Sequence, residues 1–265
     1  MSLEIVTAYY NDLHRLDWQN VIGNSKLTVY HKNDQLKIGE SIDDNHIEIP
    51  NFGRCDYAFI LHIIKNYDNL SDVTVFTKLN WKDQPTNLPL LINEAPNYDY
   101  AEVGFEKQAY LWHDGINTSY PKNIKIDHNV DTSETKFSKK EHSKLYHISY
   151  DPDCMNDWYN HIYGKGSVPG VVYAFSHGPC FSVSKQLIQR HPIEIYQYLL
   201  DRFHPYHSWN NHLAKQYYAH KHPDGVTDAH VLKYIGHHYH DQLLRFWRVL
   251  FTHRADTSLF KIRPS

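Results

Sequence analysis

The chain has 265 residues, of which 41% are hydrophobic and 22% are charged. This length and composition are typical of a folded globular protein and exclude wholesale disorder. With neutral histidines the net charge is −3, so no basic excess indicates a nucleic acid or anionic membrane partner. Because no run of about 18 apolar residues and no signal-peptide pattern occurs, we expect no membrane span.

The cysteines and the polar aromatic residues bear on location and ligand class. Cys55, Cys154 and Cys180 are too scattered for a disulfide framework or a zinc knuckle, so we expect a reducing, cytoplasmic location. The chain also contains 21 Tyr, 21 His and 6 Trp, whose apolar bodies and polar edges suit a polyhydroxylated ligand. Codon bias in a viral or AT-rich genome explains the same excess.

The first 80 residues alternate between strand and helix patterns. Residues 3–10 and 27–32 are continuous β-rich runs, and residues 12–23 between them have apolar residues at helical spacing with a closing glycine. Residues 47–55 form a short strand, and residues 56–67 a helix that Asp56 is expected to cap.

Residues 73–81 complete this half as another buried strand. The alternation predicts an α/β protein with a central, mostly parallel sheet covered by helices on both faces. Ligands of such sheets bind at the carboxyl ends of the strands. The loops of interest are therefore those after Tyr10, Lys32, Asn51 and Trp81.

The second half is less regular. Residues 83–145 are polar and contain several prolines, which predicts an irregular surface region. Residues 171–184 indicate a hairpin, and the helix after it contains Pro192, which either kinks it or starts a second helix. Residues 241–251 have the spacing of an amphipathic helix. We expect one domain, with a donor-binding half (1–82), a loop region (83–145) and a helical acceptor half (146–265).

Several segments in order resemble one family. They read VTAYYNDLHRLDW, IPNFGRCDYAFILHIIKNYDNLSDVTVFTK, GPCFSVSKQLIQRHPIEIYQYLLDRF and LLRFWRVLF. This order is similar to the family catalogued as domain of unknown function 3431, found in fungi, algae and large DNA viruses. Cys55 stands where that family has a glutamate, and Leu244 where its terminal helix carries another. Asp56 and Asp241 are the acidic residues nearest to those positions.

The layout also resembles GT-A glycosyltransferases, including metal-independent branching N-acetylglucosaminyltransferases and peptide xylosyltransferases. The resemblance implies a Rossmann-like half that binds a nucleoside-diphosphate sugar and a second half that binds an oligosaccharide or glycoprotein acceptor. It also implies a basic side chain that offsets the diphosphate charge and a late carboxylate that acts as the base. A UDP-sugar is the expected donor, with UDP-xylose among the candidates.

Candidate donor-binding residues lie at strand ends and turns. Arg54 follows a glycine turn at a helix start, and Lys78 ends a buried strand, so both are placed to bind phosphate unless they are ordinary surface cations. The other candidates for the donor site are Tyr9, Tyr10, His177 and Gly178. The Gly-Pro turn after His177 either lets backbone approach a ligand or simply joins a hairpin.

Candidate catalytic and metal residues lie late in the chain. Asp151 and Asp153 either hold Mn²⁺ or Mg²⁺ or open a turn. Asp241 either acts as the general base or caps its helix, and His240 competes for the base role.

We therefore expect a glycosyltransferase that inverts the anomeric carbon. The alternatives are a non-catalytic carbohydrate-binding or capsid-associated protein and, from the histidines at 237–240, a zinc hydrolase. Oligomeric state is not predicted.

Overall fold

The protein was analysed as a computed structural model. The residues that the structure describes are 1–10, 19–33, 41–43, 46–51, 53–79, 88–102, 106–110, 130–131, 158, 161–162, 172–176, 180–203, 225, 227, 243, 246–247 and 250–251. In chain order the elements are β1 (Leu3–Tyr9), α1 (Gln19–Ile22), β2 (Lys26–Asn33), β3 (Ser41–Asp43), β4 (His46–Pro50), α2 (Arg54–Asn66), β5 (Val73–Lys78), α3 (Leu88–Glu94), η2 (Ala95–Asn97), β6 (Tyr100–Glu102), β7 (Glu106–Tyr110), β8 (Val130–Asp131), β9 (Val172–Ser176), β10 (Phe181–Ser184), α6 (Lys185–Gln189) and α7 (Ile193–Asp201).

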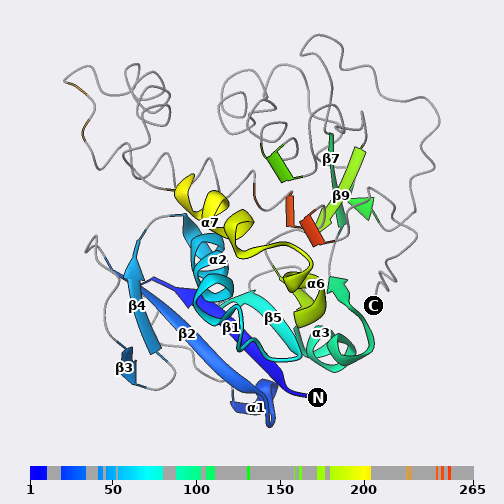
Figure 1. Ribbon diagram of the computed structural model, residues 1–265. Coiled ribbons are helices and arrows are strands. Elements are labelled where there is room, and N and C mark those ends of the chain that lie inside the picture. Colours follow the sequence, from blue (N-terminus) through cyan, green and yellow to red (C-terminus); the bar gives the residue numbers. More distant parts are fainter. Residues whose placement is uncertain are drawn as a thin grey trace.

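The main sheet has seven strands in the order β3-β4-β2-β1-β5-β10-β6 (Figure 1). Strand β1 is parallel to β2 and β5, and β2 is parallel to β4. Strand β10 is antiparallel to both β5 and β6, and β3 is antiparallel to β4. The predicted α/β class is confirmed, and the sheet is mixed, with a parallel centre.

The sheet separates two apolar cores. On one face, Ala8, Tyr30 and Phe76 pack with α2, α7 and the helical residues near the C-terminus. On the other face, Ile5 and Val75 pack with residues of α1 and α3. Burial on both faces explains why these strands are continuous apolar runs rather than alternating ones.

Helix α2 lies on the first of these faces and begins at Arg54, after Gly53. The prediction that Asp56 caps the helix is wrong. Gly53 occupies the cap position without a side-chain hydrogen bond, and Asp56 is fully buried. Its carboxylate Oδ1 accepts a 2.6 Å hydrogen bond from the Trp247 indole, because the apolar surroundings require a partner for the buried charge.

Pro192 starts a second helix, which is one of the two outcomes predicted from the sequence. Helix α6 is capped by the Ser184 hydroxyl, which accepts from the backbone N–H of Leu187 at 3.2 Å, and Pro192 stands at the cap of α7. Between the two helices, Arg190 donates to the carbonyl of Phe251, and His191 Nε2 lies 2.6 Å from the carbonyl of Leu250. Arg190 and His191, which connect the two helices, therefore satisfy backbone carbonyls of the C-terminal segment.

The predicted hairpin at 171–184 is wrong. Strand β9 pairs with β7 in a separate three-stranded sheet, whereas β10 pairs with β5 and β6 in the main sheet. All four residues of β10 are buried, and the strand takes up the main-chain hydrogen bonds along the side of β5. Adjacency in sequence favours a hairpin, but the unpaired side of β5 competes successfully for the same strand.

The predicted irregular region is also wrong in part, because α3, η2, β6, β7 and β8 lie between residues 88 and 131. Leu88 and Leu91 are fully buried on the sheet. Pro89 lies in the first turn of α3 and Pro96 in the first turn of η2, where no intrahelical N–H bond is required. The prolines thus start helices in this segment and do not interrupt them.

The predicted helix at 241–251 is confirmed where the structure describes it. The described residues are helical and buried, namely Leu243, Phe246, Trp247, Leu250 and Phe251. The Trp247 and Phe251 rings stack at 5.7 Å, and both contact Phe181 of β10. The C-terminal segment therefore packs on the α2 side of the main sheet.

Candidate functional site

The candidate site is the edge of the sheet where the parallel strands end. We call it the carboxyl edge, formed by the last residues of β1, β2, β4 and β5 and the first turn of α2. From β1 the chain first adds β2 and β4 on one side of that strand, and it then adds β5 on the other side. The strand order therefore reverses between β1 and β5. In open α/β sheets this topological switch point is where ligands bind.

Three cationic side chains lie around the first turn of α2. Strand alternation puts Lys32 of β2 on the same face as Tyr30, and Lys78 of β5 on the same face as Phe76. The charges of Lys32 and Lys78 both act on Cys55, and the charge of Arg54 acts on Lys32. We call Lys32, Arg54 and Lys78 the cation cluster.

Strand β1 separates the two strands that carry the lysines. It lies between β2 and β5, and Ala8, whose register partner on β5 is Lys78, is its residue on this face. Positive charge from the helix N-terminus adds to that of the side chains, so the site favours an anion.

Lys32 differs from the other two cations in its burial. Its exposed fraction is 4%, whereas Arg54 is exposed and Lys78 is half-buried. Burial lowers the pKa of Lys32 to about 7, and Arg54 acts in the same direction, although Cys55 and Asp56 oppose it. The Lys32 amine therefore exchanges its proton near neutral pH.

The backbone at the start of α2 is left-handed at two successive residues. Gly53 has φ +64° and Arg54 has φ +46°. A Cβ atom on Gly53 would lie 2.5 Å from Cδ1 of Phe203, so only glycine fits without displacing that ring. This turn holds Arg54 at the carboxyl edge with its side chain exposed.

Cys55 and Asp56 complete the first turn of α2. Burial raises the pKa of the Cys55 thiol to about 12, and the charge of Asp56 acts in the same direction. A thiol of this kind stays protonated and is no nucleophile at neutral pH. Asp56 connects the turn to Trp247, so the C-terminal segment lies beside the cation cluster.

The opposite face of the same edge carries an aromatic pair. The Tyr9 ring stacks on the His31 ring with 4.7 Å between centroids, and His31 Nδ1 lies 3.8 Å from Glu48 Oε1. Asn33 donates to the same carboxylate at 3.2 Å. Tyr9 is buried, and the next residue, Tyr10, is 38% exposed.

The structure thus brings together part of the predicted site. Arg54 and Lys78 lie around one helix turn, and Tyr9 and Tyr10 lie at the same edge of the sheet. Six predicted site residues lie outside the described residues, namely Asp151, Asp153, His177, Gly178, His240 and Asp241. Among the described residues, no group of three or more His, Cys, Asp or Glu side chains is arranged to hold a metal ion.

Two residues of the site were missed by the sequence reasoning. Lys32 ends the pattern Thr28-Tyr30-Lys32, whose alternation already assigns it to the α2 face, so the period of the strand was a usable signal. Trp247 was assigned to the core, and its hydrogen bond to Asp56 spans 191 residues of sequence. A local sequence pattern cannot predict a contact between residues so far apart in the chain.

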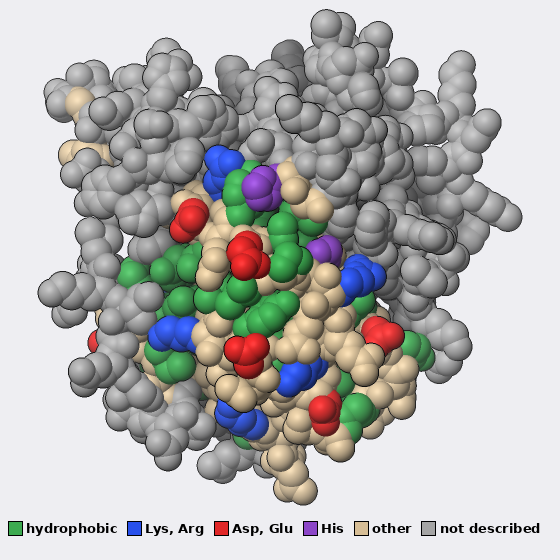
Figure 2. Space-filling model, in the orientation of Figure 1, with side chains coloured by type: hydrophobic (Ala, Val, Ile, Leu, Met, Phe, Trp, Pro, Cys, Tyr) green, Lys and Arg blue, Asp and Glu red, His purple; other side chains and the backbone are tan. Residues whose placement is uncertain are grey.

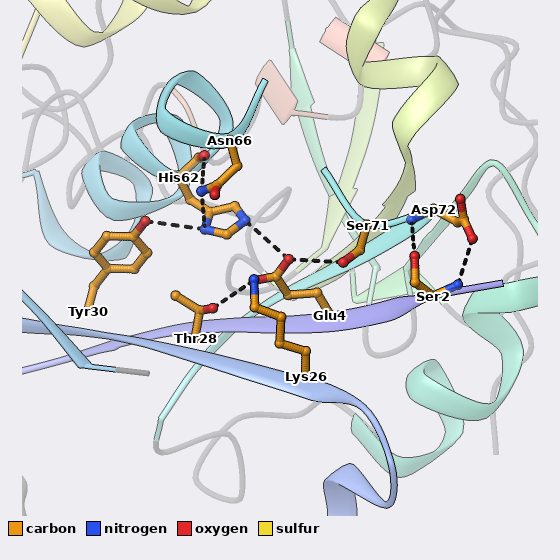
Figure 3. A network of polar contacts seen from close by, with 9 residues as sticks. All are labelled: Ser2, Glu4, Lys26, Thr28, Tyr30, His62, Asn66, Ser71 and Asp72. Atoms are coloured by element: carbon orange, nitrogen blue, oxygen red, sulfur yellow. Dashed lines mark hydrogen bonds and ion pairs between the residues drawn. The ribbon is translucent and has the colours of Figure 1, made fainter. Parts of the chain in front are cut away.

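A second polar cluster lies toward the opposite end of the strands (Figure 3). The buried Glu4 carboxylate accepts from Thr28 at 2.6 Å and from Ser71 at 3.1 Å, and it pairs with Lys26 at 3.0 Å. His62 Nε2 lies 3.8 Å from the same carboxylate. Because these contacts join β1, β2, α2 and the turn before β5, the cluster has a structural role.

A hollow of about 660 Å³ also lies at this end, beside Met1 and the start of α6. Three of its polar side chains bond to the protein itself. Asp72 accepts from the backbone N–H of Ser2, Lys185 donates to the carbonyl of Asp68, and Gln189 donates to the carbonyl of Tyr67. The carboxyl edge is therefore the better candidate site.

Comparison with family models identifies the chain. It belongs to the family described as "Protein of unknown function (DUF3431)", whose model matches residues 5–222. Comparison with curated proteins and with solved structures gives no match. In the part of the chain that the structure describes, no helix is both long and apolar enough to span a membrane.

Proposed function

We propose that this protein is a glycosyltransferase that moves a sugar from a nucleoside-diphosphate sugar to a glycan acceptor. The observation that carries the proposal is the cation cluster at the carboxyl edge. Lys32, Arg54 and Lys78 surround a helix start at the switch point of the sheet. Cations and helix N–H groups together match the two negative charges of a sugar-linked diphosphate.

The chemistry that we propose is a single displacement. An acceptor hydroxyl attacks the anomeric carbon while the bond from that carbon to the diphosphate oxygen breaks. The hydroxyl proton passes to the carboxylate of Asp241, and the nucleoside diphosphate leaves with its charge balanced by the cation cluster. The product therefore has an inverted anomeric carbon.

The position of the C-terminal segment supports the base assignment. Trp247, six residues after Asp241 in sequence, is hydrogen-bonded to Asp56 in the first turn of α2. This contact holds Trp247 at the helix turn that begins with Arg54, and we keep Asp241 as the proposed base. The resemblance to GT-A enzymes also assigns the base to a late carboxylate.

The donor and acceptor classes follow from that resemblance. We propose a UDP-sugar donor, with UDP-xylose among those to test, and an oligosaccharide or glycoprotein acceptor. Asp151 and Asp153 remain the predicted ligands of Mn²⁺ or Mg²⁺. A cytoplasmic location also remains a prediction.

Nucleotide-sugar binding tests the proposal directly. UDP-xylose, UDP-glucose and GDP-mannose are added to the chain with and without Mn²⁺, and the melting temperature is measured. Stabilisation by at least one of them is expected, because a ligand of the folded state raises its stability. A glycan-binding protein without transferase activity ignores all three.

Two matched lysine variants test whether the nucleotide sugar binds at the cation cluster. Lys78→Met is expected to weaken donor binding about tenfold or more, through the loss of a charge-assisted hydrogen bond. The control is Lys65→Met, because Lys65 is exposed in the last turn of the same helix, α2. This variant is expected to bind the donor as tightly as the native chain does. Equal binding by both variants contradicts the site.

The Asp241→Asn variant tests the base. It is expected to bind the donor normally and to lose turnover, measured as release of nucleoside diphosphate in the presence of a glycan acceptor. Undiminished turnover removes Asp241 from the mechanism and leaves His240 as the other predicted base.

A further inference from the structure

The hollow beside the start of α6 has a volume of about 660 Å³ and lies at the amino end of β5. This volume is within the range of small-molecule sites, about 300–1,000 Å³. Val73 on its wall and Lys78 in the cation cluster are the two ends of β5, which lie about 16 Å apart in an extended strand. The hollow is therefore separate from the carboxyl edge, where we propose that the donor binds.

Backbone hydrogen bonds join the three segments that form the wall of the hollow. These segments are the turn before β5, the stretch from η2 to β6, and α6 with its cap. The N–H of Ser184 donates to the carbonyl of Asp99 at 2.8 Å, and the N–H of Lys185 donates to the carbonyl of Asp72 at 2.9 Å. Two further hydrogen bonds join Asp72 to Ser2 (Figure 3). The main chain around the hollow is thus held in place without a ligand, which lowers the entropic cost of binding one.

Four side chains on this wall present polar groups to the hollow that the fold itself does not use. In the part of the chain that the structure describes, the side chains of Asn97, Tyr98, Asp99 and Gln186 have no hydrogen bond or ion pair. Tyr98 is half-buried, and the other three are exposed. The wall therefore offers two amides, a carboxylate and a phenol to a ligand.

The chemistry of these groups matches a sugar. An amide or a carboxylate can hydrogen-bond two neighbouring hydroxyl groups, and the ring of a tyrosine provides an apolar surface for the C–H face of a pyranose. The charged side chains on the wall, Asp72, Asp99 and Lys185, are of both signs. The hollow therefore favours an uncharged ligand over an anion or a cation.

We propose that this hollow binds a neutral oligosaccharide and is a carbohydrate site separate from the donor site. The inference goes beyond the proposed function and does not depend on it. Asn97, Asp99 and Gln186 bind hydroxyl groups of the sugar, and Tyr98 supports one face of a sugar ring. No covalent bond of the sugar changes at this site.

Isothermal titration calorimetry with neutral oligosaccharides tests the site. The probes are chitotetraose, xylotetraose, mannotetraose and cellotetraose, each titrated into the native chain. At least one of them is expected to bind, with an affinity that salt does not change, because the ligand carries no charge. Tyr98→Ala is expected to weaken this binding about tenfold, whereas Tyr98→Phe keeps the ring and most of the affinity.

A matched pair of glutamine variants distinguishes the hollow from the rest of the surface. Gln186 in α6 and Gln197 in α7 are both exposed, and of the two only Gln186 lines the hollow. Gln186→Ala is expected to weaken oligosaccharide binding about fivefold, through the loss of a hydrogen bond. Gln197→Ala is expected to bind as the native chain does, and circular dichroism checks that every variant is folded.

The remaining outcomes overturn the inference. Absence of binding by all four oligosaccharides shows that the hollow is no site for a neutral glycan. Undiminished binding by Tyr98→Ala and Gln186→Ala, or an equal loss in Lys78→Met, places the sugar elsewhere on the chain. Because nucleotide-sugar binding is measured separately, each of these results leaves the proposed function intact.

Discussion

Gly53 holds a left-handed backbone conformation at the start of α2, directly against the ring of Phe203. Replacement by alanine therefore has two costs, the strain of the backbone and the collision of the new methyl group. Gly53→Ala is expected to lower the free energy of unfolding by about 3 kcal/mol, of which about 1 kcal/mol is backbone strain. Urea denaturation followed by circular dichroism measures the loss.

Gly23→Ala is the matched control for that variant. Gly23 also has a positive φ, +54°, but an added Cβ meets no atom within 4 Å. Its loss should be about 1 kcal/mol, because only the strain remains. If the two variants are equally destabilised, the contact between Gly53 and Phe203 does not limit the turn.

Single residues also show where sequence reasoning succeeds at the site. Arg54 follows a glycine turn and Lys78 ends a strand, so local pattern alone places both at the carboxyl edge. Lys32 stands at an equivalent strand end, yet its side chain is almost fully buried. Local pattern identifies the edge, but the depth of a side chain depends on elements that are distant in sequence.

At the scale of elements, the contact between Trp247 and Asp56 joins the C-terminal segment to α2. Trp247→Phe keeps an aromatic ring in the core but removes the N–H that donates to the buried carboxylate. The expected loss is about 1 to 3 kcal/mol in the free energy of unfolding, the range for a buried acceptor that loses its donor. Thermal or urea denaturation measures it.

A double-mutant cycle separates this bond from the loss of ring area. Asp56→Asn keeps an oxygen that accepts from the indole, whereas Asp56→Ala removes it. Trp247→Phe should therefore cost less in the Asp56→Ala background than in the native or Asp56→Asn background. The same cost in every background would assign the effect to packing alone.

Elements also differ in how far sequence determines them. β1, β2, β5 and α2 are found at the predicted places because their apolar periods are strong and uninterrupted. The pairing of β9 and β10 was mispredicted because each strand has a competing partner elsewhere in the fold. A sequence pattern predicts that one segment is a strand, whereas the neighbour of that strand in the sheet depends on several segments that compete for its hydrogen bonds.

For the whole molecule, the face shown in Figure 2 bears on partners. Its acidic and basic side chains are interspersed among apolar and neutral ones and do not gather by sign. Among the side chains that the structure describes on this face, there is therefore no basic stripe of the kind that follows a phosphate polymer. The described cations that favour an anion are gathered instead at the carboxyl edge.

Acid is expected to destabilise the whole fold through the buried network of Figure 3. Burial lowers the pKa of His62 from 6.5 to about 4, despite the opposing charge of Glu4. The unfolded chain therefore binds more protons than the folded one between these values, and stability falls as pH falls through this window. From pH 7 to pH 4.5 this histidine should account for about 2 to 3 kcal/mol.

The pKa of Glu4 is also lowered, because His62, Thr28 and Lys26 together outweigh its burial, so acid weakens the network further. Urea denaturation at pH 7 and pH 4.5 should show a smaller acid loss for His62→Gln than for the native chain. His161→Gln, at an exposed position, serves as the control. An equal acid loss in His62→Gln and the native chain would contradict the role of His62.

The amino-acid sequence by itself determined the α/β class, the parallel centre of the sheet and the edge that carries Arg54 and Lys78. These follow from local apolar periods and from the placement of glycine and charge, which each segment carries alone. Only the tertiary structure decided that β10 joins β5, that Asp56 binds Trp247 and that Lys32 is buried. Each of these depends on groups brought together from distant parts of the chain, where competition for hydrogen bonds and the exclusion of water select one partner among several.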